Sequence, residues 1–305
     1  STMSATLLFD RQSHTYDLTH PLRVEHPLAQ GLVWCGVALP GLMGGQYWHN
    51  LVDYGVEPPL GRHGLLTNMS VPFHPSQNSG WAPIYPQFAP STASAPIPNL
   101  GGELRFNGGT SYVEVADTPS LQLVNIFTIA FWIRPQVADG MIISKMGGTT
   151  CTGTDVRGIR FQASSMFVTD SGSGGGSNPL SVSWVDYFNS WAHVILTSSS
   201  SGSTLYRNGI SVATGVQLTA WFNNTRVLRI GASECTNIFI TAAGTSFQGA
   251  LGSMMLYNMA FSSESAQSLY RESLSYASLL QRLLNGEGSV GGGIPRPLFD
   301  AGVLL

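Results

Sequence analysis

FTIAFWIRP, at residues 127–135, gives a clear indication of the fold class. It consists of aromatic, β-branched and small apolar residues and ends at a proline, a composition typical of a buried β-strand. STLYRNGISVAT, at residues 203–214, has the pattern of two strands joined by Asn208 and Gly209. Asn-Gly is the dipeptide preferred in the two-residue turn of a β-hairpin. These two stretches predict antiparallel strands.

Strand-like segments separated by turn residues continue outward from this centre on both sides. They are GLVWCGVALPG (31–41), GELRFNGG (102–109), SYVEVAD (111–117), MIISKMGG (141–148), GIRFQAS (158–164), SMFVTD (165–170), PLSVSW (179–184), WAHVILTSS (191–199) and VLRIGAS (227–233). No helical pattern of useful length interrupts them before about residue 262, whereas residues 263–284 have helical spacing with a stop near Gly286. The sequence therefore predicts an all-β, two-sheet antiparallel jelly-roll sandwich with a short C-terminal helical segment.

The domain organisation follows from composition along the chain. We expect an extended arm at 1–27, the sandwich at 28–275 with a proline-rich excursion at 71–100, and a helix followed by a glycine-hinged arm at 276–305. The last arm carries an apolar tip that we expect to bind assembly partners, formed by Ile294, Pro295, Leu298, Phe299, Leu304 and Leu305.

Charge and hydropathy argue against nucleic-acid binding and against a membrane-spanning helix. The formal net charge is −3 and charged residues make up only 10% of the chain, with no basic block. Nucleic-acid binding needs clustered Lys and Arg to neutralise phosphates, so we expect no nucleic-acid partner. No apolar run approaches the length of about 18 residues that a membrane-spanning helix requires. The first residues also lack the pattern of a secretory signal peptide.

The three cysteines and one histidine are candidate reactive groups. Cys35 lies in an apolar run and is expected to be a core thiol. Cys151 and Cys235 lie in polar segments and are either free thiols or a disulfide joining two loops. His193 lies on a predicted strand, where a core or edge role is favoured over a catalytic one.

Six segments in order resemble the laminin-G-like subgroup of the concanavalin A-like lectin/glucanase superfamily. They are LxFxGxxxYVEV (104–115), FTIxFWIxP (127–135), WxHV (191–194), LYxNG (205–209), IG (230–231) and FxGxLxxxxLYNxAFS (247–262). Upstream, the strand from Gly31 and the segment GRHGLLTN (61–68) are also similar to that subgroup's opening strand and its Gly-His-Gly turn. The resemblance implies two curved sheets packed face to face, with Phe131, Trp132 and Trp191 as inward core residues.

Catalysis by this fold would need paired carboxylates. Glucanases of the superfamily carry two on one strand, spaced by two or four residues, so that both project from one face. This chain lacks that pattern, and the nearest acidic grouping, Glu114 and Asp117, has an odd spacing. We therefore expect a protein that is not an enzyme.

Calcium is a second function that the resemblance raises, because relatives often bind it. The family's G-x-I-D-E-V piece is replaced here by GALGSM at residues 249–254, and its Tyr-x-Asp-Gly hairpin by YRNG at 206–209. A calcium site needs six to eight oxygen ligands. We therefore expect no cofactor and no metal, with Asp155 and Asp170 as weak candidates for a calcium ion.

Glycan binding is a third function, for which the fold would need exposed rings and amides. The candidates are Trp184, Tyr187, Trp221, Asn223 and Asn224. The alternative is that these aromatic residues lie in the core or at a protein interface.

The two functional hypotheses differ in partner and location. Laminin-G-like domains with similar tails occur in tailed-phage virion proteins, so we predict a non-catalytic structural subunit of a virion. It would decorate a capsid or form part of a fibre, bind other virion subunits and be a homo-oligomer. The alternative is a secreted or surface carbohydrate-binding module that is extracellular and binds cell-surface glycan.

Overall fold

The protein is a sandwich of two antiparallel sheets in the computed structural model. The structure describes residues 26–38, 45–53, 62–71, 78–82, 102–145, 157–170, 177–219, 221–233 and 246–274. Sheet A follows the order β14 (Ile210–Gly215), β13 (Gly202–Arg207), β12 (Ala192–Ser199), β7 (Phe127–Pro135), β16 (Gln248–Tyr257), β5 (Glu103–Asn107) and β4 (Gly80–Ala82). Sheet B follows the order β11 (Ser177–Ser183), β10 (Ser165–Asp170), β9 (Arg157–Gln162), β8 (Gly140–Ser144), β15 (Leu228–Ile230), β6 (Tyr112–Val115), β3 (Gly64–Thr67) and β2 (Tyr47–Trp48).

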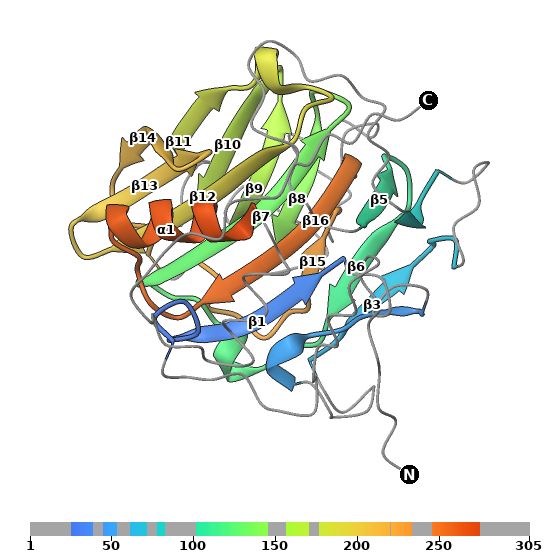
Figure 1. Ribbon diagram of the computed structural model, residues 1–305, viewed down its shortest axis with the longest axis horizontal. Coiled ribbons are helices and arrows are strands. Elements are labelled where there is room, and N and C mark those ends of the chain that lie inside the picture. The colour runs from blue at the N-terminus through green and yellow to red at the C-terminus, as the bar shows by residue number, and fades with distance from the viewer. Residues whose placement is uncertain are drawn as a thin grey trace, which may run out of the picture.

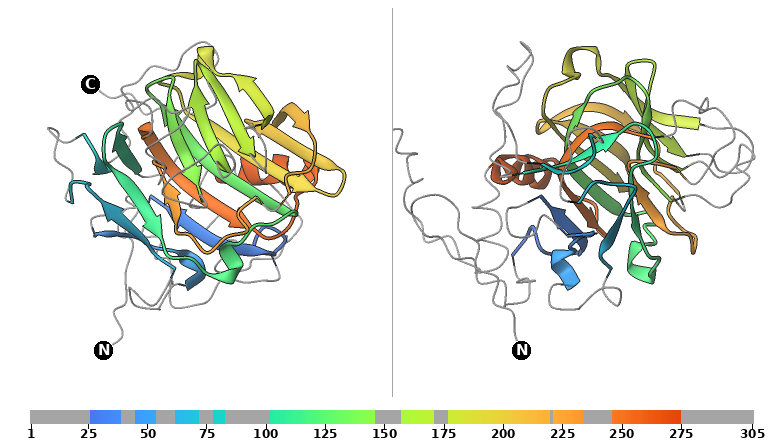
Figure 2. Two further views of the ribbon diagram at one scale, coloured as in Figure 1. Left: turned by 180° about the vertical axis from the view of Figure 1, so that it is seen from behind. Right: turned by 90° about the vertical axis from the view of Figure 1, so that its right-hand side faces the viewer.

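The first strand, β1 (Leu32–Val37), joins sheet A beside the second half of β16. Three short 3-10 helices, η1 (Leu51–Asp53), η2 (Pro119–Leu121) and η3 (Val185–Tyr187), and one α-helix, α1 (Ser263–Ser273), complete the described elements. Figure 1 shows α1 lying across sheet A, and Figure 2 shows it outside the two sheets. The predicted all-β sandwich with one short helix is confirmed.

The main core lies between the two sheets. Phe127, Ile129 and Phe131 of β7 point into it, because alternate residues of a strand face the same side. At one end of this core the Trp221 ring stacks on Phe127 with centroids 5.0 Å apart, and on Phe222 at 4.3 Å. The sandwich therefore buries large aromatic residues at its end as well as at its centre.

A second apolar cluster covers the opposite face of sheet A, under α1. Trp132 and Trp191 belong to this cluster, whereas Phe131 belongs to the core between the sheets. The prediction that all three point inward is therefore wrong for the two tryptophans. Phe131 and Trp132 are adjacent on one strand, so the pleat must send their side chains to opposite faces. Both tryptophans are still buried, because α1 supplies a cover that the sequence analysis did not place there.

α1 begins where the sequence predicted a helix. Ser262 caps its first turn, accepting a hydrogen bond from the Ser265 N–H at 3.2 Å. Ala266, Leu269 and Ser273 are its buried residues, and their spacing of three and four places them on one face. Trp132 Nε1 donates to Ser273 Oγ at 3.0 Å, which ties the end of the helix to β7.

Two further expectations can be compared with the structure. Asn208 and Gly209 have φ values of 53° and 78°, as the predicted two-residue hairpin turn between β13 and β14 requires. Within the proline-rich excursion, Trp81 of β4 is buried and packs edge-on against Trp48, with centroids 6.2 Å apart. The arm at residues 1–25 and the chain from 275 onward, with the six apolar tip residues, lie outside the described residues.

Candidate functional site

The five predicted glycan-binding residues lie at opposite ends of the sandwich. β12 and β14 run in the same direction, because each is antiparallel to β13. Trp184 and Tyr187 precede β12, whereas Trp221, Asn223 and Asn224 follow β14. The start of one strand and the end of a strand parallel to it lie at opposite ends of the sheet. The five residues therefore do not form one site.

The Trp221 side chain has no exposed area. Its ring stacks on Phe127 and Phe222, and its Nε1 donates to the Thr169 carbonyl at 2.9 Å. A sugar that stacks on a ring needs a free ring face. We therefore drop Trp221 from the candidates, and the core alternative describes it correctly.

Trp184 and Tyr187 form the corresponding aromatic group at the other end. Trp184 is fully buried, and the Arg207 guanidinium carbon lies 5.1 Å from its ring centre and 3.7 Å from that of Tyr187. Arg207 also donates to the Ser183 carbonyl at 2.8 Å. Trp184 is therefore a core residue, and Tyr187 is half-buried against an arginine.

Asn224 belongs to an oxygen-lined cage that holds the ammonium group of Lys145. Lys145 Nζ lies 2.5 Å from Asp117 Oδ1 and 2.8 Å from the Asn224 carbonyl, with the carbonyls of Phe222 and Leu121 at 3.4 and 3.5 Å. The lysine side chain is fully buried. Burial lowers the pKa of Lys145, and the Asp117 carboxylate opposes that shift.

The oxygens of this cage are of the kind that could bind calcium, but they bind the Lys145 ammonium group. Backbone carbonyls and a carboxylate are the ligands that calcium prefers, yet here they surround an ammonium group. Asp170, a weak metal candidate, instead faces Arg157 at 3.7 Å. No group of three or more His, Cys, Asp or Glu suited to a metal exists in the described part of the chain. Asp155, Cys151 and Cys235 lie outside it.

Five buried or half-buried carboxylates are each matched to a cation. The pairs are Asp53 with Arg62, Glu103 with Arg105 and Arg134, Glu114 with Arg229, Asp117 with Lys145, and Asp170 with Arg157. Glu114 and Asp117, the nearest acidic neighbours in the sequence, thus contact different cations. A glycosidase places two carboxyl groups across one scissile bond, with one of them raised in pKa. The pairing observed is the arrangement of structural ion pairs.

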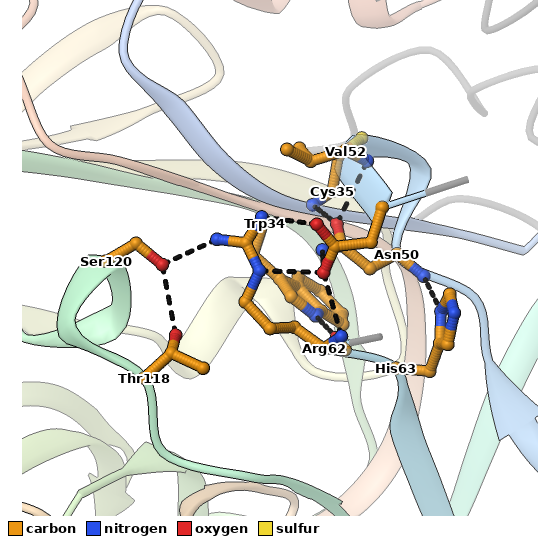
Figure 3. Close-up of polar contacts among 9 residues, drawn as sticks. Trp34, Cys35, Asn50, Val52, Arg62, His63, Thr118 and Ser120 are labelled. Carbon is orange, nitrogen blue, oxygen red and sulfur yellow. Dashed lines mark hydrogen bonds and ion pairs between the residues drawn. The ribbon is translucent and has the colours of Figure 1, made fainter. Parts of the chain in front are cut away.

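A polar network at residues 50–63 joins β1, η1 and η2 (Figure 3). Arg62 donates to both oxygens of Asp53, through Nε at 2.7 Å and Nη2 at 2.5 Å, and through Nη1 to Ser120 Oγ at 2.5 Å. Its own carbonyl accepts from Trp34 Nε1 at 2.8 Å. Arg62 also holds the pKa of Asp53 below its usual range, against the effect of burial. The network fastens the first strands to the loop before β7.

The same network contains the residue types of a thiol protease, in Cys35, His63 and Asn50. The contacts do not fit that chemistry. Cys35 offers its backbone N–H to Asn50 Oδ1 at 2.8 Å, while its thiol is buried in the cluster under α1. Burial raises the pKa of that thiol to about 12, so it carries no thiolate at neutral pH. His63 Nδ1 accepts the Asn50 N–H at 3.0 Å, which is a structural bond.

His193 is a buried histidine beneath α1. Its ring lies between Trp132 and Tyr270, with centroids 5.0 and 5.8 Å away. Burial lowers the pKa of His193 to about 3, so the ring is neutral at physiological pH. The core role expected for it is consistent with these contacts.

The outer face of sheet B carries polar and aromatic side chains that the sequence analysis did not single out. Val113, Leu228 and their alternate neighbours point into the core, so Tyr112, Glu114 and Arg229 point outward. The Arg229 guanidinium carbon lies 4.6 Å from the Tyr112 ring centre, and Nη2 lies 3.2 Å from Glu114. Two strands away, an equivalent contact joins Arg160 and Phe167 at 5.9 Å. None of the described helices packs on this face.

The outward position of these residues has a weak sequence signal. In GIRFQ, at residues 158–162, an arginine stands between two apolar residues, as expected for an outward side chain of a half-buried strand. The neighbours of that side chain depend on strand register, which sequence pattern alone does not supply.

The two-sheet antiparallel sandwich is the architecture of a concanavalin A-like domain. The sequence matches the laminin-G family described as the concanavalin A-like lectin/glucanases superfamily over residues 107–267, which is more than half of the chain. The protein belongs to this family. No sequence among curated proteins matches it significantly.

Solved structures with the same fold include two botulinum neurotoxins and a sialidase. Botulinum neurotoxin type C, which enters cells in a manner dependent on two ganglioside molecules, is 13% identical over 82% of this chain and 53% of its own, with a TM-score of 0.53. The binding domain of serotype D/C is 14% identical over 81% of this chain and 53% of its own, with a TM-score of 0.52. Trypanosoma rangeli sialidase in complex with sialic acid is 14% identical over 80% of this chain and 34% of its own, with a TM-score of 0.50.

This chain thus spans about half the length of the neurotoxin structures and a third of the sialidase. At such identity the likeness establishes the fold alone. Separately, among the described residues no helix has both the length and the apolar character needed to span a membrane.

Proposed function

We propose that this protein is a non-catalytic carbohydrate-binding module that binds glycan on the outer face of sheet B. The observation that carries the proposal is the difference between the two outer faces. Sheet A is covered by α1, whereas on the outer face of sheet B arginines lie against aromatic rings on neighbouring strands. Aromatic rings and charged hydrogen-bond donors are the groups that a sugar-binding surface needs.

Two further observations support this proposal. The matched carboxylates favour a binding role, because each one already neutralises a cation. The related fold also serves proteins that interact with gangliosides or sialic acid. This extends the carbohydrate-binding alternative from the sequence, with a different set of residues.

A glycan array tests the proposal with the whole chain as probe. We expect binding to at least one glycan class, and weaker binding by a Tyr112→Ala variant, which removes the ring under Arg229. Ser211→Ala on the exposed edge strand β14 is the control and should bind as the original protein does. Absence of binding to any glycan, or equal binding by Tyr112→Ala and the original, would refute the proposed face.

The virion hypothesis stays a prediction. It depends on the arms, whose residues lie outside the described part of the chain. Deletion of residues 286–305 should then abolish incorporation into a particle without unfolding the sandwich.

A further inference from the structure

We propose that Arg160 is the anion-binding group of sheet B's outer face and that the glycan bound there is acidic, with a carboxylate that pairs with this guanidinium. The inference rests on the proposed glycan-binding function and specifies its ligand class and central residue.

Strand register places Arg160 on the outer face. It stands between Ile159 and Phe161 of β9, both of which point into the core. Its cross-strand partners are Met141 on β8 and Phe167 on β10. The side chain therefore lies in the middle of three paired strands, where little of it reaches solvent, and the residue is only 9% exposed.

The guanidinium lacks the partners that a buried cation needs. Its Nε is buried with no hydrogen-bond partner, and no carboxylate among the described residues lies within ion-pair distance of it. Asp139 acts on it only as a more distant charge. Arginine keeps its proton in proteins, so it cannot remove the cost of burial by becoming neutral. A buried N–H without a hydrogen-bond partner is costly, and an anionic ligand would supply that partner.

A second unpartnered group lies beside it. Thr169 of β10 is buried, and its Oγ1 has no hydrogen-bond partner either. Thr169 pairs with Gly158, which shares the face of Arg160 on β9. A Cβ atom at position 158 would lie 2.2 Å from the Ile143 carbonyl oxygen, so only glycine fits. The backbone of β8 thus closes over Gly158, and the Arg160 guanidinium and the Thr169 hydroxyl are the polar groups beside it.

These groups match the parts of an acidic sugar. A carboxylate accepts two parallel hydrogen bonds from a guanidinium fork, a geometry that lysine cannot reproduce. A threonine hydroxyl can donate to or accept from a sugar hydroxyl. The half-buried Phe167 ring, next to Arg160, offers an apolar surface. Arg229 on the same face already pairs with Glu114, so Arg160 supplies the uncompensated positive charge.

The test measures binding of two matched probes to the full chain by titration calorimetry. One is a trisaccharide that ends in sialic acid, and the other is lactose, its neutral counterpart. We expect tighter binding of the acidic probe, weakened by added salt. Arg160→Met should weaken that binding by roughly ten- to hundredfold, the range for loss of a charged hydrogen bond. Arg271→Met removes the same charge from the exposed surface of α1 and should leave binding unchanged.

The outcomes separate this inference from the proposed function. Equal binding of acidic probe by Arg160→Met and the original protein would refute the role of Arg160. Glycan binding that does not distinguish acidic from neutral sugars would refute the acidic ligand and leave the proposed function standing. Absence of any glycan binding would refute both. If Arg160→Met fails to fold, Thr169→Val serves as the second variant, and unchanged affinity there together with salt-independent binding of the original protein would refute the site.

Discussion

The loop end around Lys145 and the outer face around Arg160 both bury a basic side chain, but the surroundings of the two side chains differ. Lys145 follows β8 and is surrounded by a carboxylate and three backbone carbonyls. Arg160 lies on β9, with an unpartnered Nε and no carboxylate in ion-pair contact among the described residues. Burial of a charge is therefore not by itself a functional signal. The presence or absence of compensating oxygens distinguishes a structural cation from a candidate binding group.

His193 shows a third way to bury a basic side chain. Its ring is enclosed under α1 and its pKa is lowered to about 3, so it is buried without charge. Arginine lacks this option, since its pKa stays far above neutrality. Lys145 is thus buried with oxygen partners, His193 is buried without charge, and Arg160 is buried with an unpartnered Nε. Each of these differences can be measured.

The largest effect is expected from Lys145→Met. The change leaves Asp117 and the carbonyls of the cage without their donor, which should lower the free energy of unfolding by about 3–5 kcal/mol. Urea denaturation measures it. A Lys145→Met, Asp117→Leu double variant should regain part of the loss, because both partners of the pair are then removed. A single variant as stable as the original would show that the cage contributes nothing.

The next effect is a dependence on pH from His193. Its folded pKa, about 3, lies below the usual histidine pKa of 6.5, so only the unfolded state takes up a proton between these values. Stability is therefore fully present above 6.5 and falls as the pH decreases, by roughly 1.4 kcal/mol per pH unit. Between pH 7 and pH 5 this amounts to about 2 kcal/mol. His193→Phe should lose that component in urea titrations at the two pH values; parallel behaviour of both proteins would contradict it.

A smaller effect is expected from Asn224→Ala at the edge of the cage. Asn224 Nδ2 donates to the Lys145 carbonyl at 3.1 Å, and its Oδ1 accepts the Arg226 N–H at 3.0 Å. Loss of both bonds should cost about 1–2 kcal/mol in denaturation experiments. Asn223→Ala is the matched control, because the neighbouring side chain is exposed, and it should change stability little. Equal effects from both variants would show that the Asn224 bonds do not support the cage.

The smallest effect is expected from Arg160→Met. Replacing an unpaired buried cation with an apolar side chain of similar length should leave stability within about 1 kcal/mol, or raise it. The same denaturation measurement, placed beside Lys145→Met, is the direct test of the comparison. A loss as large as that of Lys145→Met would mean that Arg160 has a structural partner in the folded chain.

The elements were predictable from the sequence where local pattern decides them. The strand at 127–135, the Asn208-Gly209 hairpin and the start of α1 all follow from alternation, turn chemistry or capping, which act over a few residues. The positions of Trp132 and Trp221 were not predictable in this way. Trp132 is buried on the outer face of sheet A by a helix more than a hundred residues later, and Trp221 is buried by stacking on a distant strand.

The candidate site depended on long-range register even more. Arg160 and Thr169 become neighbours only through the pairing of β9 with β10, and the lack of a partner becomes visible only when all surrounding strands are placed. Lys145 is likewise recognisable as a structural cation only from its contacts with Asp117 and Asn224, which approach from two separate loops. Trp184 and Trp221 lie in polar segments of the sequence, which suggested exposure, but both are buried in the folded protein.

The position of β16 has a consequence for how the protein is made. It lies in sheet A between β7 on one side and β5 and β1 on the other, yet it is the last described strand to leave the ribosome. Until then β1 has no partner there and β7 lacks one neighbour, so sheet A cannot close during most of synthesis. Pairing across so long a stretch of chain is slow and exposes strand edges to aggregation. A nascent chain that ends before Gln248 should therefore be prone to aggregation and depend on chaperones.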